Sequence, residues 1–563
     1  MTDVTSLLPL AAVAVPALAA VLVLLSGAHP NVREAWTVLG SLGTVAVVAL
    51  LVGDGATHVT PLGSLVGIDL ALRADAAGLL FALLASTLWV ATSLYSVGYM
   101  RGLGEARQTR YFAAFAASIA ATMGVALAAD LLTLFVFYEL LTLATYPLVV
   151  HAGDGPARRA GRKYLAYTLG GGVLALTGIL LVRVLADTVA FVPGGVADLA
   201  ATDPALARAA FGLLVAGFGV KAAVVPLHAW LPAAMVAPTP VSGLLHAVAV
   251  VKSGAFAVYR SVLYVFGPET ASDLGVAVPL AVVAAATMLL AGLVGIRQDN
   301  LKRGLAYSTI SQLSYIVLGV ALLTPLAAFG ALLHVVAHAF MKITLFFGAG
   351  VIYVETGEKY VSDLAGVGRR LPVTITAFAV GAAGLVGFPL VAGFVSKFHL
   401  VLGAAAAPSG VFVAAFLVAG LLKLLYFWPI VYVAFFGRSD GADPASRHAF
   451  APPHAATRTG STSHVPGVPV AADGVSVAAD GSGPHAPPDA ENVVPTDGPG
   501  RDAARTAAID PASRWERPRG LETSAFLLVP VVFTVGVAVL LGLVPTALPF
   551  WELAETAVGE VFG

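Results

Sequence analysis

Long apolar runs recur along the whole chain, and they constrain its fold more than any other feature. Each covers about 18–25 residues, enough for an α-helix to cross roughly 30 Å of hydrocarbon. We count about fourteen such runs, at residues 5–26, 36–53, 77–99, 111–128, 131–151, 163–187, 209–236, 241–266, 276–296, 304–323, 327–353, 373–405, 412–437 and 522–545. Strands of membrane barrels are shorter and alternate in polarity. The runs therefore predict an all-α integral membrane protein with about 14 transmembrane helices.

The composition excludes a water-soluble protein and several kinds of chemistry. The 563 residues are 58% hydrophobic and only 11% charged, whereas soluble domains are roughly 25% charged. A net charge of -1 gives no basic surface for nucleic acid. Because the chain has no cysteine, it cannot build iron–sulfur clusters or thiolate metal sites. We expect no cofactor and no metal, and any redox chemistry would belong to another subunit.

The charged loops predict how the chain crosses the membrane. Lys and Arg collect in cytoplasmic loops, and alternate loops here are rich in them. These loops carry Arg33, Arg101, Arg107, Arg110, Arg158, Arg159, Arg162, Lys163, Arg297, Lys302, Arg303, Lys359, Arg369 and Arg370. The opposite loops hold little beyond Arg73 and Arg208. We expect a multi-pass protein of the cell membrane with both termini outside and a retained first helix rather than a signal peptide.

One segment lacks apolar runs altogether. Residues 438–520 are rich in Pro, Gly, Ala and Asp, which predicts a disordered cytoplasmic linker. Its histidines are His448, His454, His464 and His485. They are widely spaced and have no paired ligands, so a solvated segment is favoured over a metal site.

Five lysines lie inside the apolar runs. The chain has only eight lysines against 23 arginines, and the five are Lys221, Lys252, Lys342, Lys397 and Lys423. A charge at mid-membrane costs at least ~2.5–3.5 kcal/mol, so it is expected only with a partner, a wet cavity or a task. Burial can bring lysine into a titrating range, whereas arginine stays charged. The distribution indicates a path for protons.

Glu139 is the acidic counterpart of these lysines. It lies in the middle of the 131–151 run without a charged neighbour in sequence, and it needs a cation from another helix. Lys221 is the nearest candidate by depth. A pair that opens and closes would shift both protonation equilibria; the alternative is a permanent ion pair that joins two helices.

The 209–236 run is predicted to be interrupted. Pro226 and Pro232 remove backbone donors inside it, and interrupted helices at membrane depth are tolerated beside wet cavities in transporters. His228 follows Lys221 by seven residues, and His246 precedes Lys252 by six. Each histidine is a candidate proton carrier, although a simple interhelical hydrogen bond would explain it equally well.

Three titratable side chains share one face of the 327–353 run. His334, His338 and Lys342 recur at intervals of four residues. Two histidines at this spacing can hold zinc, but no third ligand is in view and the lysine would repel a cation. Imidazole titrates near neutrality, so a proton relay is favoured.

The 373–405 run repeats features of the interrupted one. Its proline and glycines precede Lys397, and Gly393-Phe-Val-Ser-Lys397 echoes Gly217-Phe-Gly-Val-Lys221. Paired broken segments in corresponding places indicate an internal repeat with a transport site in each half.

At these residues the chain resembles the antiporter-like subunits of Mrp-type cation/proton antiporters, respiratory complex I and membrane-bound hydrogenases, most closely the D-type subunit of the Mrp antiporter. The strongest motifs are Tyr138-Glu139, the Lys221-to-Lys252 block and His338-Ala-Phe-Met-Lys342. The resemblance implies two inverted five-helix repeats, at 111–266 and 276–437, with broken seventh and twelfth helices. Residues 1–110 would form about three further spans, and 521–563 a final helix and tail.

The resemblance also implies roles for individual residues. Glu139 would pair with Lys221, Lys252 and Lys342 would pass protons along the central axis, and Lys397 would end the second half-channel. The expected function is proton translocation in a sodium/proton antiporter, with protons, sodium and other membrane subunits as partners. The alternatives are a pumping subunit of an NADH:quinone oxidoreductase or hydrogenase, which would make it part of a translocase enzyme, and a structural subunit that carries no protons.

Overall fold

The structure is a computed structural model that describes residues 3–197, 199, 201, 203–408, 410–437 and 521–563. The described helices belong to one compact unit. The predicted linker 438–520, with its four histidines, lies outside the described residues.

Helices make up most of the described chain. They are α1 (Leu8–Leu25), α2 (Pro30–Asp54), α3 (Ala76–Gly102), α4 (Gln108–Ala126), α5 (Leu131–Val149), α6 (Gly155–Ala186), α7 (Pro204–Lys221), α8 (Trp230–Ala233), α9 (Thr239–Gly243), α10 (Val250–Arg260), α11 (Gly267–Asp273), α12 (Ala277–Ile296), α13 (Leu301–Ala321), α14 (Pro325–Thr356), α15 (Val367–Arg370), α16 (Pro372–Val386), α17 (Ala392–Ala406), α18 (Val411–Phe436), α20 (Ala525–Leu543) and α21 (Phe550–Phe562). Two π-helical turns, Leu244–Val248 and Ser261–Phe266, join α9, α10 and α11 into one continuous segment.

Twelve helical segments in the described ranges are long and apolar enough to cross a membrane. The helix α4 lies at the fourth predicted run but is not among these twelve, and the 373–405 run is divided between the two shorter apolar helices α16 and α17. The prediction of an all-α integral membrane protein is therefore confirmed, and the chain is a multi-pass membrane protein. The inverted symmetry of two repeats stays a prediction.

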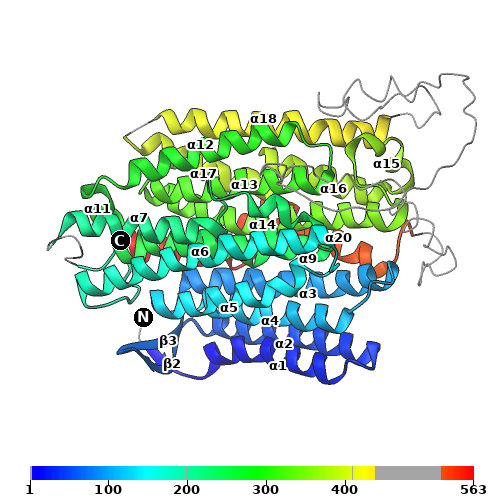
Figure 1. Cartoon of the computed structure of the whole chain (residues 1–563). Coiled ribbons are helices and arrows are strands. Elements are labelled where there is room, and N and C mark those ends of the chain that lie inside the picture. Colours follow the sequence, from blue (N-terminus) through cyan, green and yellow to red (C-terminus); the bar gives the residue numbers. More distant parts are fainter. Residues whose placement is uncertain (1–2, 198, 200, 202, 409, 438–520) are drawn as a thin grey trace, which may run out of the picture. The chain divides into compact units, whose positions relative to one another are not determined.

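A small sheet near the N-terminus was not predicted. Its strands are β1 (Asp3–Thr5), β2 (Thr57–Leu65) and β3 (Ile68–Ala74), in the order β1-β2-β3. The β1 strand runs parallel to β2, and β2 pairs antiparallel with β3. These residues fall between apolar runs, where a search for spanning helices gives no signal. Figure 1 shows the β2–β3 hairpin and the C-terminus toward the same end of the helices.

Several basic residues expected in loops lie in the ends of helices instead: Arg33 in α2, Arg101 in α3, Arg110 in α4, and Lys302 and Arg303 in α13. The first turns of α6 are the clearest case. Arg158, Arg159, Arg162 and Lys163 were expected in a loop, but α6 already begins at Gly155. The Asp154 carboxylate caps the helix by accepting a hydrogen bond from the Ala157 amide at 2.8 Å, and a proline stands in the first turn. The capping carboxylate and the proline start the helix before the apolar run begins. The apolar run predicts only the part of a helix that crosses the membrane.

Two segments form the buried centre of the helices. In α14 and in Thr239–Asp273, every residue of the most apolar stretch is buried, whereas in α18 only a third of that stretch is buried. Figure 1 shows α14 among the inner helices, with α1 and α2 along one side and α12 and α18 along the other. Apolar side chains exposed on the outer helices are suited to lipid. The lysines and histidines in the inner helices are therefore shielded from lipid.

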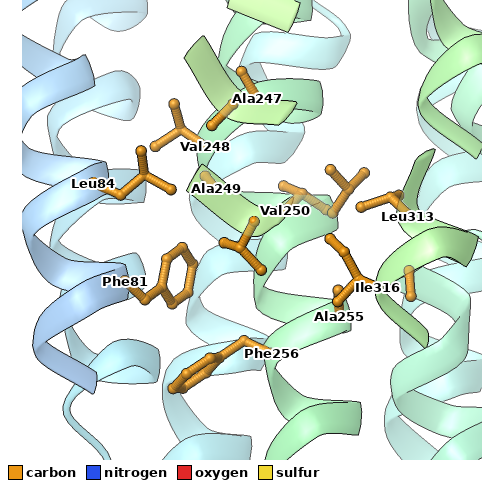
Figure 2. Packing of buried hydrophobic residues seen from close by; sticks show 14 of the residues in the cluster. Phe81, Leu84, Ala247, Val248, Ala249, Val250, Ala255, Phe256, Leu313 and Ile316 are labelled. Carbon is orange, nitrogen blue, oxygen red and sulfur yellow. The ribbon is translucent and has the colours of Figure 1, made fainter. Parts of the chain in front are cut away.

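Close apolar packing fixes α10 between two neighbours. Phe81 and Leu84 of α3 lie on one side of it, and Leu313 and Ile316 of α13 lie on the other (Figure 2). The Phe81 and Phe256 rings are 5.1 Å apart. This packing holds the helix that carries Lys252 at a fixed depth.

Both predicted breaks are present, and neighbouring side chains compensate for them. Between α7 and α8 the helix is interrupted from Ala222 to Ala229. There the Val225 amide donates to Thr287 Oγ1 at 3.1 Å, and Trp230 Nε1 donates to the Val220 carbonyl at 2.8 Å. Backbone groups freed inside a membrane need such partners.

Candidate functional site

Lys221 is the last residue of α7, directly before the break. Its side chain is fully buried. The ammonium donates a hydrogen bond to the Tyr138 carbonyl of α5, and it lies 3.3 Å from the centroid of the Tyr138 ring. The Tyr138 hydroxyl is near the Gly217 and Phe218 carbonyls of α7, at 3.5 and 3.4 Å. Tyr138 therefore holds Lys221 through its backbone and its ring.

Glu139 follows Tyr138 but does not form the expected ion pair. Among the described contacts, no ion pair joins it to Lys221, although the two groups interact electrostatically. Its Oε1 atom is buried without a hydrogen-bond partner in the described chain. The carboxylate lies against Gly172 of α6, where an added Cβ would be 2.8 Å from Oε1. The carboxylate and the ammonium are thus neighbours that lack direct contact in this state.

Lys252 and His338 join the two central helical segments. Both side chains are fully buried, and Lys252 Nζ shares a hydrogen bond with His338 Nδ1. His338 Nε2 has no partner within the described ranges. A lysine and a histidine in direct contact can exchange a proton, because either nitrogen can hold it.

His246 lies in the π-helical turn just before α10. It is fully buried, and neither ring nitrogen has a partner among the described residues. Its ring packs 4.9 Å from that of Phe346, and it interacts electrostatically with Lys342 and Lys252. Two unsatisfied imidazole nitrogens are costly in an apolar core. Single π-helical turns are frequent at functional sites, and His246 lies in such a turn.

His334 has hydrogen bonds suited to two protonation states. Its Nε2 lies 2.8 Å from Gln312 Oε1, and the Gln312 amide nitrogen donates to the Leu385 carbonyl, which fixes the amide orientation. Its Nδ1 lies 2.9 Å from Ser396 Oγ. The Ser396 hydroxyl can donate to Nδ1, or turn to the Gly393 carbonyl 3.3 Å away and accept from a protonated ring. His334 can therefore gain a proton without losing a hydrogen bond.

Lys342 lies on the same face of α14, two turns beyond His334. Its ammonium donates to Ser308 Oγ at 2.8 Å and to the Leu305 carbonyl at 3.2 Å, both on α13. Ser308 is thus the serine of this helix that contacts a lysine. Ser311 and Ser314 donate to backbone carbonyls instead.

Lys397 lies at the second break. Its ammonium donates to the Leu385 and Val386 carbonyls at the end of α16, the latter at 3.1 Å. It also lies 4.8 Å from the centroid of the Tyr315 ring. Lys221 and Lys397 thus occur in similar settings, each beside an interrupted helix and over a tyrosine ring.

The other candidates differ in their surroundings. His228 lies in the first break, half-buried, with Nδ1 unpartnered in the part of the chain that the structure describes. No group of three His, Cys, Asp or Glu side chains that could hold a metal occurs in the ranges that the structure covers. The sequence reasoning named Tyr138 in a motif without a role, and it missed Tyr315, Gln312 and Ser396, because polar side chains without charge give no signal until the helices are packed.

These side chains form a series through the protein core. His334 and His338 stack with their rings 6.1 Å apart, and His334 also stacks on Tyr315 at 5.4 Å. The described contacts run from Lys252 through His338 and His334 to the Tyr315 ring, beside which Lys397 lies. The fold and these residues define a helical membrane protein with titratable side chains buried along its centre.

Comparison with known proteins identifies the family. Residues 128–423 match the family described as "NADH:quinone oxidoreductase/Mrp antiporter, TM". The chain is 37% identical over 384 residues to the NADH-quinone oxidoreductase subunit N of Desulforudis audaxviator, covering 66% of this chain and 73% of the relative. The chain belongs to this family of membrane subunits.

Other similar proteins include components of antiporters. A probable K(+)/H(+) antiporter component of Rhizobium meliloti is 32% identical over 435 residues, which cover 72% of this chain and 42% of that protein. The chain therefore spans less than half of that relative's length. The fold is also similar to a chain of the Mrp complex from Dietzia, with a TM-score of 0.77, 24% identity, and coverage of 99% of this chain and 97% of that one.

Proposed function

We propose that this chain is the proton-translocating component of an antiporter, built from several subunits, that exchanges a monovalent cation, sodium, for protons. The observation that carries the proposal is the contact between Lys252 and His338, which links two buried titratable groups on different helices. Relatives that are components of a K(+)/H(+) antiporter and of a Na(+)/H(+) antiporter support the coupling to a monovalent cation. Other membrane subunits would complete the complex.

Protons would enter near Glu139 and Lys221 and leave near Lys397. Between them the path would use Lys252, His338 and Lys342, with His334 toward the second break and His228 and His246 as further carriers. Neighbouring ammonium groups repel, so protonation of one disfavours protonation of the next. A cation gradient acting on the complex would bias this series in one direction.

A pumping subunit of an NADH:quinone oxidoreductase is the second candidate. The relative at 37% identity favours it, because that protein is a subunit of such an enzyme. The proton path would be the same, but an electron-transfer step elsewhere in the complex would drive it. Without cysteine, this chain would take no part in that electron transfer through iron–sulfur clusters.

Proton flux in vesicles that carry the native complex separates the two. We would measure flux driven by sodium or potassium gradients, with and without a respiratory electron donor, in wild type and in Lys221→Ala. Flux driven by a sodium gradient without the donor, and lost in Lys221→Ala, is the expected result. Flux that requires the donor would make the chain a redox-pump subunit. The exposed Lys359 provides the control Lys359→Ala, which should keep wild-type flux.

A purely structural role for the chain predicts that the lysine variants affect assembly and leave proton flux unchanged. If the buried charges only join helices, Lys252→Ala and Lys342→Ala would lower the amount of assembled complex, and flux per complex would be unchanged. Full flux in an assembled Lys221→Ala complex would also contradict the proposed function.

A further inference from the structure

Lys423 is a buried lysine that the proposed path does not use. It lies on α18, and its side chain is fully buried. Its ammonium donates to the Ala419 carbonyl of its own helix at 3.2 Å, and it lies 4.3 Å from the centroid of the Tyr315 ring. This is sparse solvation for a charge that faces neither water nor lipid.

No counter-ion in the described helices around it explains this lysine. The helix α18 packs against α12, α13, α15, α16, α17 and the 3₁₀ turn Val361–Asp363. Among these elements, as described, only the Val361–Asp363 turn contains a carboxylate, α15 contributes Arg369 and Arg370, and α18 itself has no acidic residue. The charged groups that act electrostatically on Lys423 are Lys397 and Lys342, not Asp363. The titratable groups that face Lys423 are Tyr315 on α13 and Lys397 on α17, while α12 and α16 have none. Lys423 therefore does not join α18 to these neighbouring elements through an ion pair.

The position of Lys423 links two members of the proposed path. It shares the Tyr315 ring with Lys397, and it interacts electrostatically with both Lys397 and Lys342. Lys342 in turn lies 5.9 Å from the centroid of the Phe427 ring. Phe427 is four residues beyond Lys423, hence one turn along the same face of α18. Lys423 therefore lies between Lys342, in the middle of α14, and the second break.

Tyr315 fixes the geometry of this cluster. Its hydroxyl donates to the Phe416 carbonyl of α18 at 3.0 Å, which ties α13 to α18. Its ring attracts the ammonium groups of Lys397 and Lys423 and stacks on His334. Tyr315 is thus a positioning residue that gathers three titratable side chains around one ring.

We propose that Lys423 is a further proton-carrying residue, which receives a proton from the Lys342 ammonium and passes it to a neutral Lys397 amine. The inference rests on the proposed proton path and extends it to α18. Each step moves one proton between amine nitrogens through intervening water, and no electron is transferred. Lys423 would then carry the proton from Lys342 on α14 to the second break, and flux through the path would depend on this step.

Substitution by methionine and by arginine separates a carrier from a fixed charge. Lys423→Met keeps an unbranched side chain, one atom shorter than lysine, and removes the charge. Lys423→Arg keeps the charge, but arginine does not release its proton in the working range. A carrier predicts a loss of flux in both variants, on the order of a hundredfold as for other proton-transfer groups. A lysine that acts only through its charge predicts nearly normal flux in Lys423→Arg, and that result would overturn the inference.

The experiment uses the native complex in vesicles and measures proton flux per assembled complex across a pH series. Leu421→Met is the matched control, because Leu421 is on the same helix and 57% exposed; its flux should equal wild type. Lys221→Ala is measured alongside. If Lys221→Ala loses flux and both Lys423 variants keep it, Lys423 is not a carrier and the proposed function stands. If wild-type flux does not depend on Lys221, the proposed function itself fails.

Lys423→His keeps the inference testable if the other variants do not assemble. Histidine titrates at lower pH than lysine. The flux optimum should therefore move to lower pH in this variant. An unchanged pH profile in an assembled Lys423→His complex would overturn the inference.

Discussion

The positions of single titratable side chains in this protein depend on close contacts with one or two neighbouring residues. The Glu139 carboxylate, for example, is placed by the absence of a side chain at Gly172. Lys221 is placed by the backbone and ring of Tyr138. Small changes beside these groups should therefore alter function more than they alter the fold.

Gly172→Ala tests the position of Glu139. The new Cβ would lie 2.8 Å from Oε1, closer than atoms can approach, so the carboxylate has to move. We expect proton flux to fall by roughly tenfold with assembly unchanged. Gly170→Ala is the control, because a Cβ there meets no atom of the described chain within 4 Å. Equal flux in the two variants would mean that the position of Glu139 does not limit transport.

His151 gives a test of pH dependence outside the spanning helices. It lies just after α5, and burial together with Arg110 and Arg107 lowers its pKa from 6.5 to about 4. The unfolded chain therefore binds a proton at a higher pH than the folded chain. Between about pH 6.5 and pH 4, stability should fall as the pH falls.

The variant His151→Gln should reduce this pH dependence. The measurement is the thermal unfolding of the purified complex at a series of pH values, because a glutamine has no proton to gain. His29→Gln, at an exposed histidine before α2, is the control and should keep the wild-type slope. An unchanged slope in His151→Gln would show that other groups cause the acid sensitivity.

At the scale of helices, function depends on where α7 and α10 approach each other. A Cβ at Gly254 of α10 would lie 2.6 Å from the carbonyl carbon of Lys221 and 2.8 Å from its Cβ. Only glycine permits this approach. The contact places the helix that carries Lys252 against the residue at the first break.

Gly254→Ala should therefore separate the two helices. We expect a loss of about 1–3 kcal/mol in stability from overpacking, together with reduced proton flux. Gly212→Ala on α7 is the control, because nothing in the described ranges lies within 4 Å of its added Cβ. Thermal unfolding and flux of both variants are the measurements. Full flux in Gly254→Ala would show that this approach is not needed for transport.

Across the whole described unit, one buried ion pair connects segments that are far apart in the chain. Arg260, fully buried at the end of α10, donates to Asp75 Oδ1 at 2.5 Å, and Asp75 caps α3. Glu560 of the C-terminal helix α21 interacts electrostatically with both. The Tyr264 hydroxyl is 3.4 Å from the Ala557 carbonyl of α21.

Asp75→Asn should destabilise the unit. Asparagine still caps α3, but the Arg260 charge is left without its partner, which costs about 3–5 kcal/mol. The melting temperature of the complex should fall. Asp154→Asn removes a charge from the exposed cap of α6 and should have little effect. Similar melting temperatures for the two variants would contradict a stabilising role for the pair.

The sequence by itself determined the membrane class, the helical fold and the identity of most titratable residues in the core. It did so because burying a charge in lipid is costly, so five lysines within apolar runs stand out. The prolines also indicated the first break. The N-terminal sheet and the extra turns of α6 escaped this reasoning, because they lie outside the apolar runs.

Only the tertiary structure decided which groups meet. Spacing along one helix shows that His334, His338 and Lys342 share a face, but not that Lys252 reaches His338 from another helix. It also could not show that Lys221 contacts Tyr138 rather than the Glu139 carboxylate. Contacts between helices depend on depth, rotation and close approach, and these are set by packing of the whole bundle rather than by local sequence.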